Sequence, residues 1–188
     1  MPLKRLITVD NWGQWFTGPS TSLPIWPGLI LGGALFAAAS AQAQQGASLR
    51  PIPAAECQQL AAQTQQATGI RTTASEDDFA DLTDGADGRS CHIAGSATGQ
   101  AIVTPGELIA KVGTIFAGWR NDPSRDADGP NGGEKGYVNG SRIATVEANW
   151  EPGPGVTCSD KEPLSSCKIT PQQKQWNVVI DVVEKSGK

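Results

Sequence analysis

Four cysteines constrain this chain more than any other feature of its sequence. Consecutive members of the set Cys57, Cys91, Cys158 and Cys167 are separated by 33, 66 and 8 residues. An even number of cysteines in an exported chain is typical of a disulfide framework. Of the three pairings that four cysteines allow, we favour Cys57–Cys91 with Cys158–Cys167, because each bond then stays within one half of the chain. In the chain-entropy model such bonds contribute roughly 3–4 and 2–3 kcal/mol.

These spacings do not suit a structural zinc site. Such sites usually hold the metal with two close pairs of ligands, with roughly two to four residues between the members of a pair. The four cysteines contain no such pair. We therefore expect disulfides rather than zinc.

The N-terminal segment predicts export, which fits the cysteine content. Residues 29–39 form an apolar run of signal-peptide length, preceded by a basic pair near the start. The run is too short to span a bilayer comfortably. The small residues Ala41 and Ala43 then predict cleavage before Gln44.

We accordingly divide the chain into a signal peptide, residues 1–43, and a single exported domain, residues 44–188, that is periplasmic or secreted. The n-region of this signal is unusually long. Two alternatives remain open: an earlier cleavage that uses Ala39 and Ala41, and an uncleaved helix that anchors the protein. After cleavage we expect no membrane attachment.

Two helices are predicted, each with a recognisable start. The first begins near Pro53, because proline is favoured in the first turn, and Gly69 is a natural stop. The second begins at Thr104, where the sequence TPGE supplies an N-cap, a proline in the first turn and a glutamate three residues after the cap. It should end near residues 118–120.

Alternating apolar residues predict the strands. They cover residues 70–74, 89–98, 142–151 and 175–184. The acidic stretch 75–88 is interpreted as a solvated loop or a short helical turn. The glycine-rich stretch 121–140 is interpreted as a connector, because glycine, asparagine, aspartate and proline are the usual turn residues.

The order of these elements predicts an α+β fold. Strands that follow one another without helical crossovers favour antiparallel pairing. We expect a small antiparallel sheet of three to four strands with two helices packed on one face. Cys57 on the first helix and Cys91 on a strand should face the same core, so that their disulfide staples the helix to the sheet.

The charge and the scarcity of histidine exclude several functions. The formal net charge is −4 and no stripe of Lys and Arg is present, which argues against nucleic-acid binding. The single histidine, His92, should point to the solvent side of its strand, because it lies between the core-facing Cys91 and Ile93. With all cysteines paired, no nucleophile–base pair is predicted. We predict no catalytic residue and no cofactor.

Acids within the strands carry the strongest hint of chemistry. Glu147 and Asp181 fall in two predicted strands, near Asn149 and Asn177. If these strands pair, all four side chains share the open face of the sheet. A carboxylate-based hydrolase would use such acids, although a plain solvated face is the commoner interpretation of one-sided antiparallel sheets.

Residues 124–134, SRDADGPNGGE, look at first like a calcium loop. Asp126 and Asp128 suit the first and third ligand positions of an EF-hand, but a proline stands at the fifth position and Tyr137 at the twelfth. The EF-hand register therefore fails. A looser calcium site formed by Asp126, Asp128 and Asn131 stays open as an alternative.

We therefore expect an exported, non-enzymatic binding or accessory domain for a protein or small-molecule partner. The loop closed by Cys158 and Cys167 would serve as a rigid display element. The alternatives are a carboxylate-based hydrolase that uses acids on the open sheet face, and a calcium-stabilised structural domain. The sequence does not specify the ligand.

Overall fold

The computed structural model describes residues 48–159, 161 and 163–186. The predicted signal peptide, residues 1–43, and its cleavage region at Ala41, Ala43 and Gln44 lie outside the described residues. No helix in the part of the chain that the structure describes is both long and apolar enough to cross a membrane.

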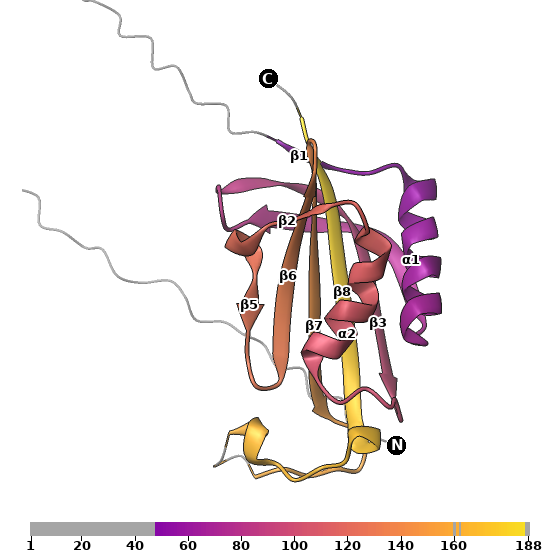
Figure 1. Ribbon diagram of the computed structural model, residues 1–188, viewed down its shortest axis with the longest axis vertical. Coiled ribbons are helices and arrows are strands. Elements are labelled where there is room, and N and C mark those ends of the chain that lie inside the picture. The colour runs from indigo at the N-terminus through magenta and orange to yellow at the C-terminus, as the bar shows by residue number, and fades with distance from the viewer. Residues whose placement is uncertain (1–47, 160, 162, 187–188) are drawn as a thin grey trace, which may run out of the picture. The chain divides into compact units, whose positions relative to one another are not determined.

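The described chain is dominated by one sheet (Figure 1). In chain order the elements are β1 (Leu49–Pro51), α1 (Ala54–Thr68), β2 (Thr72–Asp81), β3 (Ala86–Thr98), α2 (Pro105–Gly113), η1 (Thr114–Phe116), β4 (Arg120–Asn121), η2 (Pro123–Arg125), β5 (Ala127–Asp128), β6 (Gly132–Asn139), β7 (Arg142–Pro152), η3 (Leu164–Ser166), η4 (Pro171–Gln173) and β8 (Lys174–Lys185). The strand order is β2-β3-β1-β8-β7-β6-β4, β5 pairs with β6, and β3 also pairs directly with β8.

The predicted fold class is therefore wrong. The structure has 8 strands in one sheet, not a small antiparallel sheet of three to four strands. The sheet is also mixed, because β1 pairs with β3 in parallel, whereas the long strands pair antiparallel. The fold is mainly a sheet with two helices on it, rather than α+β.

Most of the strand residues that were not predicted lie in two stretches that were interpreted as loops, and the short β1 lies outside both. Residues 75–81 belong to β2, an edge strand that is mostly exposed on both faces, so no alternation of apolar residues marks it. Residues 132–139 form β6, and glycine occupies three of its positions. Gly136 is required for close approach, because a Cβ there would lie 2.5 Å from the Cβ of Arg125.

Both helices begin where their sequences predict. α1 follows Pro53 and ends at Gly69, which adopts the left-handed conformation with φ of 75°, as a glycine stop does. In α2 the Thr104 side chain accepts a hydrogen bond from the Glu107 N–H, and the Glu107 carboxylate accepts one from the Val103 N–H. The hydrogen bond from the Val103 N–H, together with the contact with Lys111, holds the pKa of Glu107 below its usual value.

The main core lies between the helices and one face of the sheet. Its buried members include Leu108 and Val112 from α2, and Val146 and Ile180 from β7 and β8. Trp150 and Trp176 also belong to this core, which agrees with their place on the apolar sides of their strands. Both α-helices lie on this side, so the opposite face of the sheet, called here the open face, has no α-helix on it in the described part of the chain.

Two disulfide bonds, Cys57–Cys91 and Cys158–Cys167, join the pairs that we favoured. The first bond connects α1 to β3, and both of its cysteines are buried in the main core. The second closes part of the long connection between β7 and β8, which lies at one end of the sheet (Figure 1). The first bond thus holds α1 against the sheet, and the second closes a loop.

Candidate functional site

The open face brings together the polar residues predicted for it. On β7 and β8, Thr145 lies opposite Asp181, and Asn149 lies opposite Asn177. The Asn177 amide nitrogen donates a hydrogen bond of 2.9 Å to the Asn149 amide oxygen. Glu147 lies two residues from Thr145 on the same face, which places it diagonally from Asp181, about 7–8 Å away between Cα atoms.

A third acid, which sequence reasoning missed, completes this group. Glu134 on β6 lies directly opposite Glu147. Burial raises the pKa of Glu134 above its ordinary value, and the negative charges of Glu147 and Asp181 raise it further. Like charges that face each other across two strands destabilise a sheet. Glu134, Glu147 and Asp181, called here the acidic triplet, therefore form a cluster in which the charges of Glu147 and Asp181 oppose that of Glu134, and Arg125 offsets them in part.

The segment 122–126 covers one end of the open face. The Asp122 N–H donates to the Gly136 carbonyl at 2.9 Å, and the Gly136 N–H donates to the Asp126 carboxylate at 3.0 Å. Both backbone groups of Gly136 are thus satisfied by this segment. The missing side chain at Gly136 lets the segment lie against β6, and this position directs Arg125 over the sheet.

Arg125 then connects two distant parts of the sheet. Its guanidinium forms ion pairs with Asp81, at the end of β2, and with Asp122. The side chains of Arg125 and Asp81 are only 8% and 2% exposed. Burial acts to lower the pKa of Arg125, but its contacts with Asp81 and Asp122 outweigh burial and raise it.

The position of this ion pair shows that the sheet is curved. Asp81 belongs to β2 at one edge, whereas Arg125 is held against β6, near the other edge. The two can meet only if the open face is concave. A small apolar cluster that includes Ile143, Val183 and Phe79 lies on the same face. The ion pair and this cluster close one end of the concave surface.

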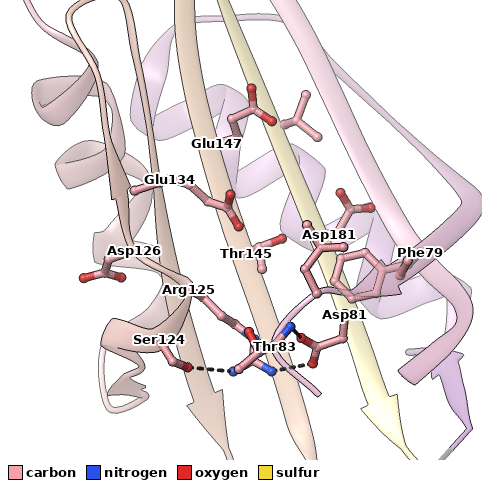
Figure 2. Close-up of a pocket in the computed structure, with 14 residues that line it drawn as sticks. Phe79, Asp81, Thr83, Ser124, Arg125, Asp126, Glu134, Thr145, Glu147 and Asp181 are labelled. Atoms are coloured by element: carbon pink, nitrogen blue, oxygen red, sulfur yellow. Dashed lines mark hydrogen bonds and ion pairs between the residues drawn. The ribbon is translucent and has the colours of Figure 1, made fainter. Parts of the chain in front are cut away.

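A cavity of about 360 Å³ lies on this concave face (Figure 2). Figure 2 shows Arg125 reaching Asp81, with the acidic triplet further along the neighbouring strands. The lining residues are Phe79, Ala80, Asp81, Leu82, Thr83, Ser124, Arg125, Asp126, Ala127, Glu134, Thr145, Glu147, Val179 and Asp181. Its volume falls within the range of ligand-binding pockets.

The single histidine lies beside the cavity wall. As predicted, His92 is on the open face, but it is not simply solvated, because its Nδ1 lies 2.9 Å from Asp181 Oδ1. The same oxygen accepts a hydrogen bond of 2.6 Å from the Ser90 hydroxyl. These two contacts fix the orientation of the Asp181 carboxylate. The sequence predicted the face of His92 but not its partner, since strand pairing decides that.

The residues of the candidate calcium loop take separate structural roles. The Asp126 carboxylate accepts from Gly136 and from the Asn121 amide, and it lies 3.8 Å from the Lys135 Nζ. Asp128 is exposed in β5, and the Asn131 carbonyl accepts from the Trp150 N–H. Within residues 48–186, leaving aside 160 and 162, no group of three or more His, Cys, Asp or Glu side chains is placed to hold a metal ion.

The geometry therefore defines a concave, acidic site with a buried arginine at one end. Glu147 and Asp181 were candidates from the sequence, whereas Arg125, Asp81 and Glu134 were not. A long-range ion pair leaves no local sequence signal, although an arginine among acids in 122–128 could have suggested a paired charge. No protein-family model, no curated protein and no solved structure matches this chain.

Proposed function

We propose that this protein is an exported, non-enzymatic domain that binds a small ligand in the cavity on the open face of its sheet. The cavity is the observation that carries the proposal. It is concave, it has a ligand-sized volume, and it combines apolar side chains such as Phe79 and Val179 with a few polar groups held in place by hydrogen bonds. A fold-stabilising surface needs no such arrangement.

The disulfides support the exported location. Structural disulfides persist in oxidising compartments such as the periplasm and the extracellular space, and they are rare in the reducing cytosol. Both pairs of cysteines in the described chain are bonded. A direct test is fractionation of cells that produce the full chain, followed by mass determination of the mature N-terminus. Export with cleavage near Ala43 predicts a product that begins at Gln44 in the exported fraction.

Filling the cavity tests the binding function. Thr145 lines the cavity on β7, so Thr145→Trp should fill it and abolish binding of any ligand that raises the melting temperature of the wild-type protein. Ser96→Trp is the matched control, because Ser96 is exposed on the same face, on β3, and does not line the cavity. A ligand that protects both variants equally well binds elsewhere and contradicts the proposal.

A second candidate function is a carboxylate-based hydrolase. It is favoured by one observation, the position of Glu134 directly opposite Glu147 together with the raised pKa of Glu134, since a carboxyl group of raised pKa beside a second carboxyl group suits general acid catalysis. Turnover of chromogenic glycosides by the wild-type protein, lost in Glu134→Gln and in Glu147→Gln, would support this function. Activity that survives both substitutions would exclude these acids.

A further inference from the structure

We propose that a second cavity of this protein, between α2 and the strands β5 and β6, binds a neutral sugar. The cavity has a volume of about 500 Å³, which is within the range of ligand-binding pockets. It borders the cavity on the open face, because Asp126 and Glu134 line both. The proposed site is additional to the open-face cavity and does not depend on ligand binding there.

A buried tyrosine carries the proposal. Tyr137 on β6 lines the cavity and is only 8% exposed. No hydrogen bond joins its hydroxyl to a residue that the structure describes, and burial raises its pKa above the ordinary value, as does the negative charge of Asp126. Buried tyrosine hydroxyls usually have a hydrogen-bond partner, because an unpaired buried polar group is costly. The missing partner points to a ligand group at this position.

The hydroxyl of Tyr137 reaches the cavity at the end of α2. The tyrosine ring belongs to the main core, where it stacks on Phe116 with 5.1 Å between the ring centroids. A Cβ at Gly113, which also lines the cavity, would lie 2.6 Å from the hydroxyl oxygen. Three side-chain polar atoms of the described residues are both enclosed and unpartnered, and this hydroxyl is not one of them. It therefore keeps accessible surface, which the absence of a side chain at Gly113 leaves uncovered.

α2 turns a face of small and apolar residues toward the cavity. Gly106, Ile109, Ala110 and Gly113 line it, and their spacing of three and four residues places them on one side of the helix. The two glycines leave space that side chains would otherwise fill. Ile109 and Ala110 supply apolar surface, which suits the C–H groups of a sugar ring.

The other lining residues offer both donors and acceptors. The Lys135 Nζ lies 3.8 Å from the Asp126 carboxylate, which is beyond hydrogen-bond distance, so its N–H groups can donate to a ligand. The Thr114 hydroxyl donates to a backbone carbonyl of α2 at 2.7 Å and can still accept. The Tyr137 hydroxyl can do both. Sugar hydroxyls also donate and accept, so they match this mixture of groups.

The charges of the lining argue against an anionic ligand. Three carboxylates, those of Asp126, Asp128 and Glu134, line the cavity with a single lysine, Lys135. A ligand with its own carboxylate would meet net repulsion there. The unpartnered hydroxyl of Tyr137 needs only an uncharged partner, which a sugar hydroxyl provides.

The tyrosine itself reports on binding, because Tyr137 is the single tyrosine of the chain. Protein labelled with ¹³C at the hydroxyl-bearing ring carbon of tyrosine gives one NMR signal, which is followed during titration with glucose, galactose, maltose and lactose. Glucuronate and galacturonate are the anionic counterparts of the first two. At least one neutral sugar should shift the signal, and glucose or galactose should bind at least about fivefold more tightly than its uronate. If no neutral sugar shifts the signal, or if the uronates bind more tightly, the proposal is wrong.

Removal of the hydroxyl tests the contact that identifies the site. Tyr137→Phe keeps the ring and its stacking on Phe116, and it should weaken sugar binding at least about fivefold, measured from the backbone amide signals of α2 and β6. It should not lower the melting temperature, because the hydroxyl has no hydrogen-bond partner among the described residues. A lower melting temperature with unchanged affinity would assign the hydroxyl a structural role and overturn the proposed contact.

Filling each cavity separates this site from the open-face cavity. Ala110→Trp should abolish sugar binding, whereas the control Ala62→Trp should not, because Ala62 is an exposed helical alanine of α1 outside the cavity. Sugar binding that survives Thr145→Trp supports the second site, whether or not the open-face cavity binds a ligand. Binding that is lost in Thr145→Trp but kept in Ala110→Trp would overturn this inference and leave the proposed function standing.

Discussion

Arg125 shows how one side chain can define a functional surface. It joins β2 to the segment held against β6 and so closes one end of the cavity, while its guanidinium stays buried between two acids. A buried charge of this kind is strongly destabilising when its partner is removed. The residue therefore couples the shape of the site to the stability of the fold.

Replacing Arg125 should consequently cost much more than replacing an exposed arginine. Arg125→Met leaves Asp81 buried without its partner, and we expect a loss of about 3–5 kcal/mol in the free energy of unfolding. Arg50→Met is the control, because Arg50 is 62% exposed in its ion pair with Glu184, and such pairs are worth about 1 kcal/mol or less. Urea denaturation measures both.

The double variant Arg125→Met/Asp81→Leu separates the two causes of that loss. It removes the unpaired carboxylate and should recover part of the stability, as replacement of buried ion pairs by apolar groups often does. A loss in Arg125→Met no larger than in Arg50→Met would show that the ion pair does not hold the two edges together.

The carboxyl group of Glu134 should make the free energy of unfolding depend on pH. Its folded-state pKa is raised above its ordinary value of 4.5, so its negative charge opposes folding at neutral pH and ceases to do so as the pH falls through the raised pKa. Glu134→Gln should therefore stabilise the protein at pH 7, by about 0.5–1 kcal/mol, because it removes both the cost of burying the charge and its repulsion by Glu147 and Asp181. Below the ordinary pKa this gain should vanish.

Thermal unfolding of Glu134→Gln and the wild-type protein, at pH 7 and below pH 4.5, tests the direction of this change in stability. Glu151→Gln is the control, because Glu151 lies exposed on the same face of β7 but outside the cavity, and it should show no such pH-dependent gain. A Glu134→Gln variant that is destabilised at pH 7 would mean that the carboxylate makes a favourable contact and does not suffer repulsion.

For single residues, the sequence predicted which face of a strand a side chain occupies better than which residue that side chain contacts. Period-two alternation placed Glu147, Asp181 and His92 on the open face, because each strand has one face packed on the core. The contact between His92 and Asp181 depends on the register of β3 against β8. The ion pair between Arg125 and Asp81 spans 44 residues, and no local pattern reveals such a contact.

Some helices and strands pack an apolar stripe into the main core, and others do not. β7, β8 and both helices carry apolar stripes that pack into the main core, and the sequence predicted all four. β2 is exposed along most of its length, and β6 contains three glycines, of which Gly136 lets the segment 122–126 lie against the strand. These two strands are stabilised by backbone pairing and close approach, which periodicity does not show.

The Cys57–Cys91 disulfide lies in the main core, whereas the Cys158–Cys167 disulfide closes a loop outside it. Their removal should therefore have different effects. Replacing Cys57 and Cys91 by alanine releases a loop of 34 residues and disturbs the contact of α1 with β3, at a cost of about 4 kcal/mol. Replacing Cys158 and Cys167 by serine releases a loop of only 9 residues, at a cost of about 2.5 kcal/mol.

Hydrogen exchange distinguishes a general loss from a local one. Loss of the Cys158–Cys167 bond should raise exchange within residues 153–173, while β7 and β8 keep their protection relative to the global stability. Loss of the Cys57–Cys91 bond should raise exchange in α1 and β3. If removing the Cys158–Cys167 bond cost more stability than removing the Cys57–Cys91 bond, the buried bond would not be what holds α1 against the sheet.

The described part of the chain is a curved sheet with both α-helices on one side and a charged hollow on the other. Curvature produces the concave site, but an open sheet also has edges, and an unpaired edge can pair with another molecule. β2 is such an edge. Its central residues Glu76, Asp77 and Asp78 are exposed acids, and charge on an edge strand opposes pairing with a second copy.

The acidic edge should therefore keep the protein from associating through β2. The triple variant Glu76→Gln/Asp77→Asn/Asp78→Asn preserves the size of the side chains and removes their repulsion, so it should form dimers or larger species that light scattering detects at concentrations where the wild-type protein does not. The control is Asp87→Asn/Asp128→Asn/Glu151→Gln, which changes the net charge by the same amount at exposed sites away from the outer edge of β2. Association of the control to the same degree would assign the effect to net charge. Association confined to the β2 variant, with slower hydrogen exchange in β2 as the concentration rises, would show that these acids protect the edge.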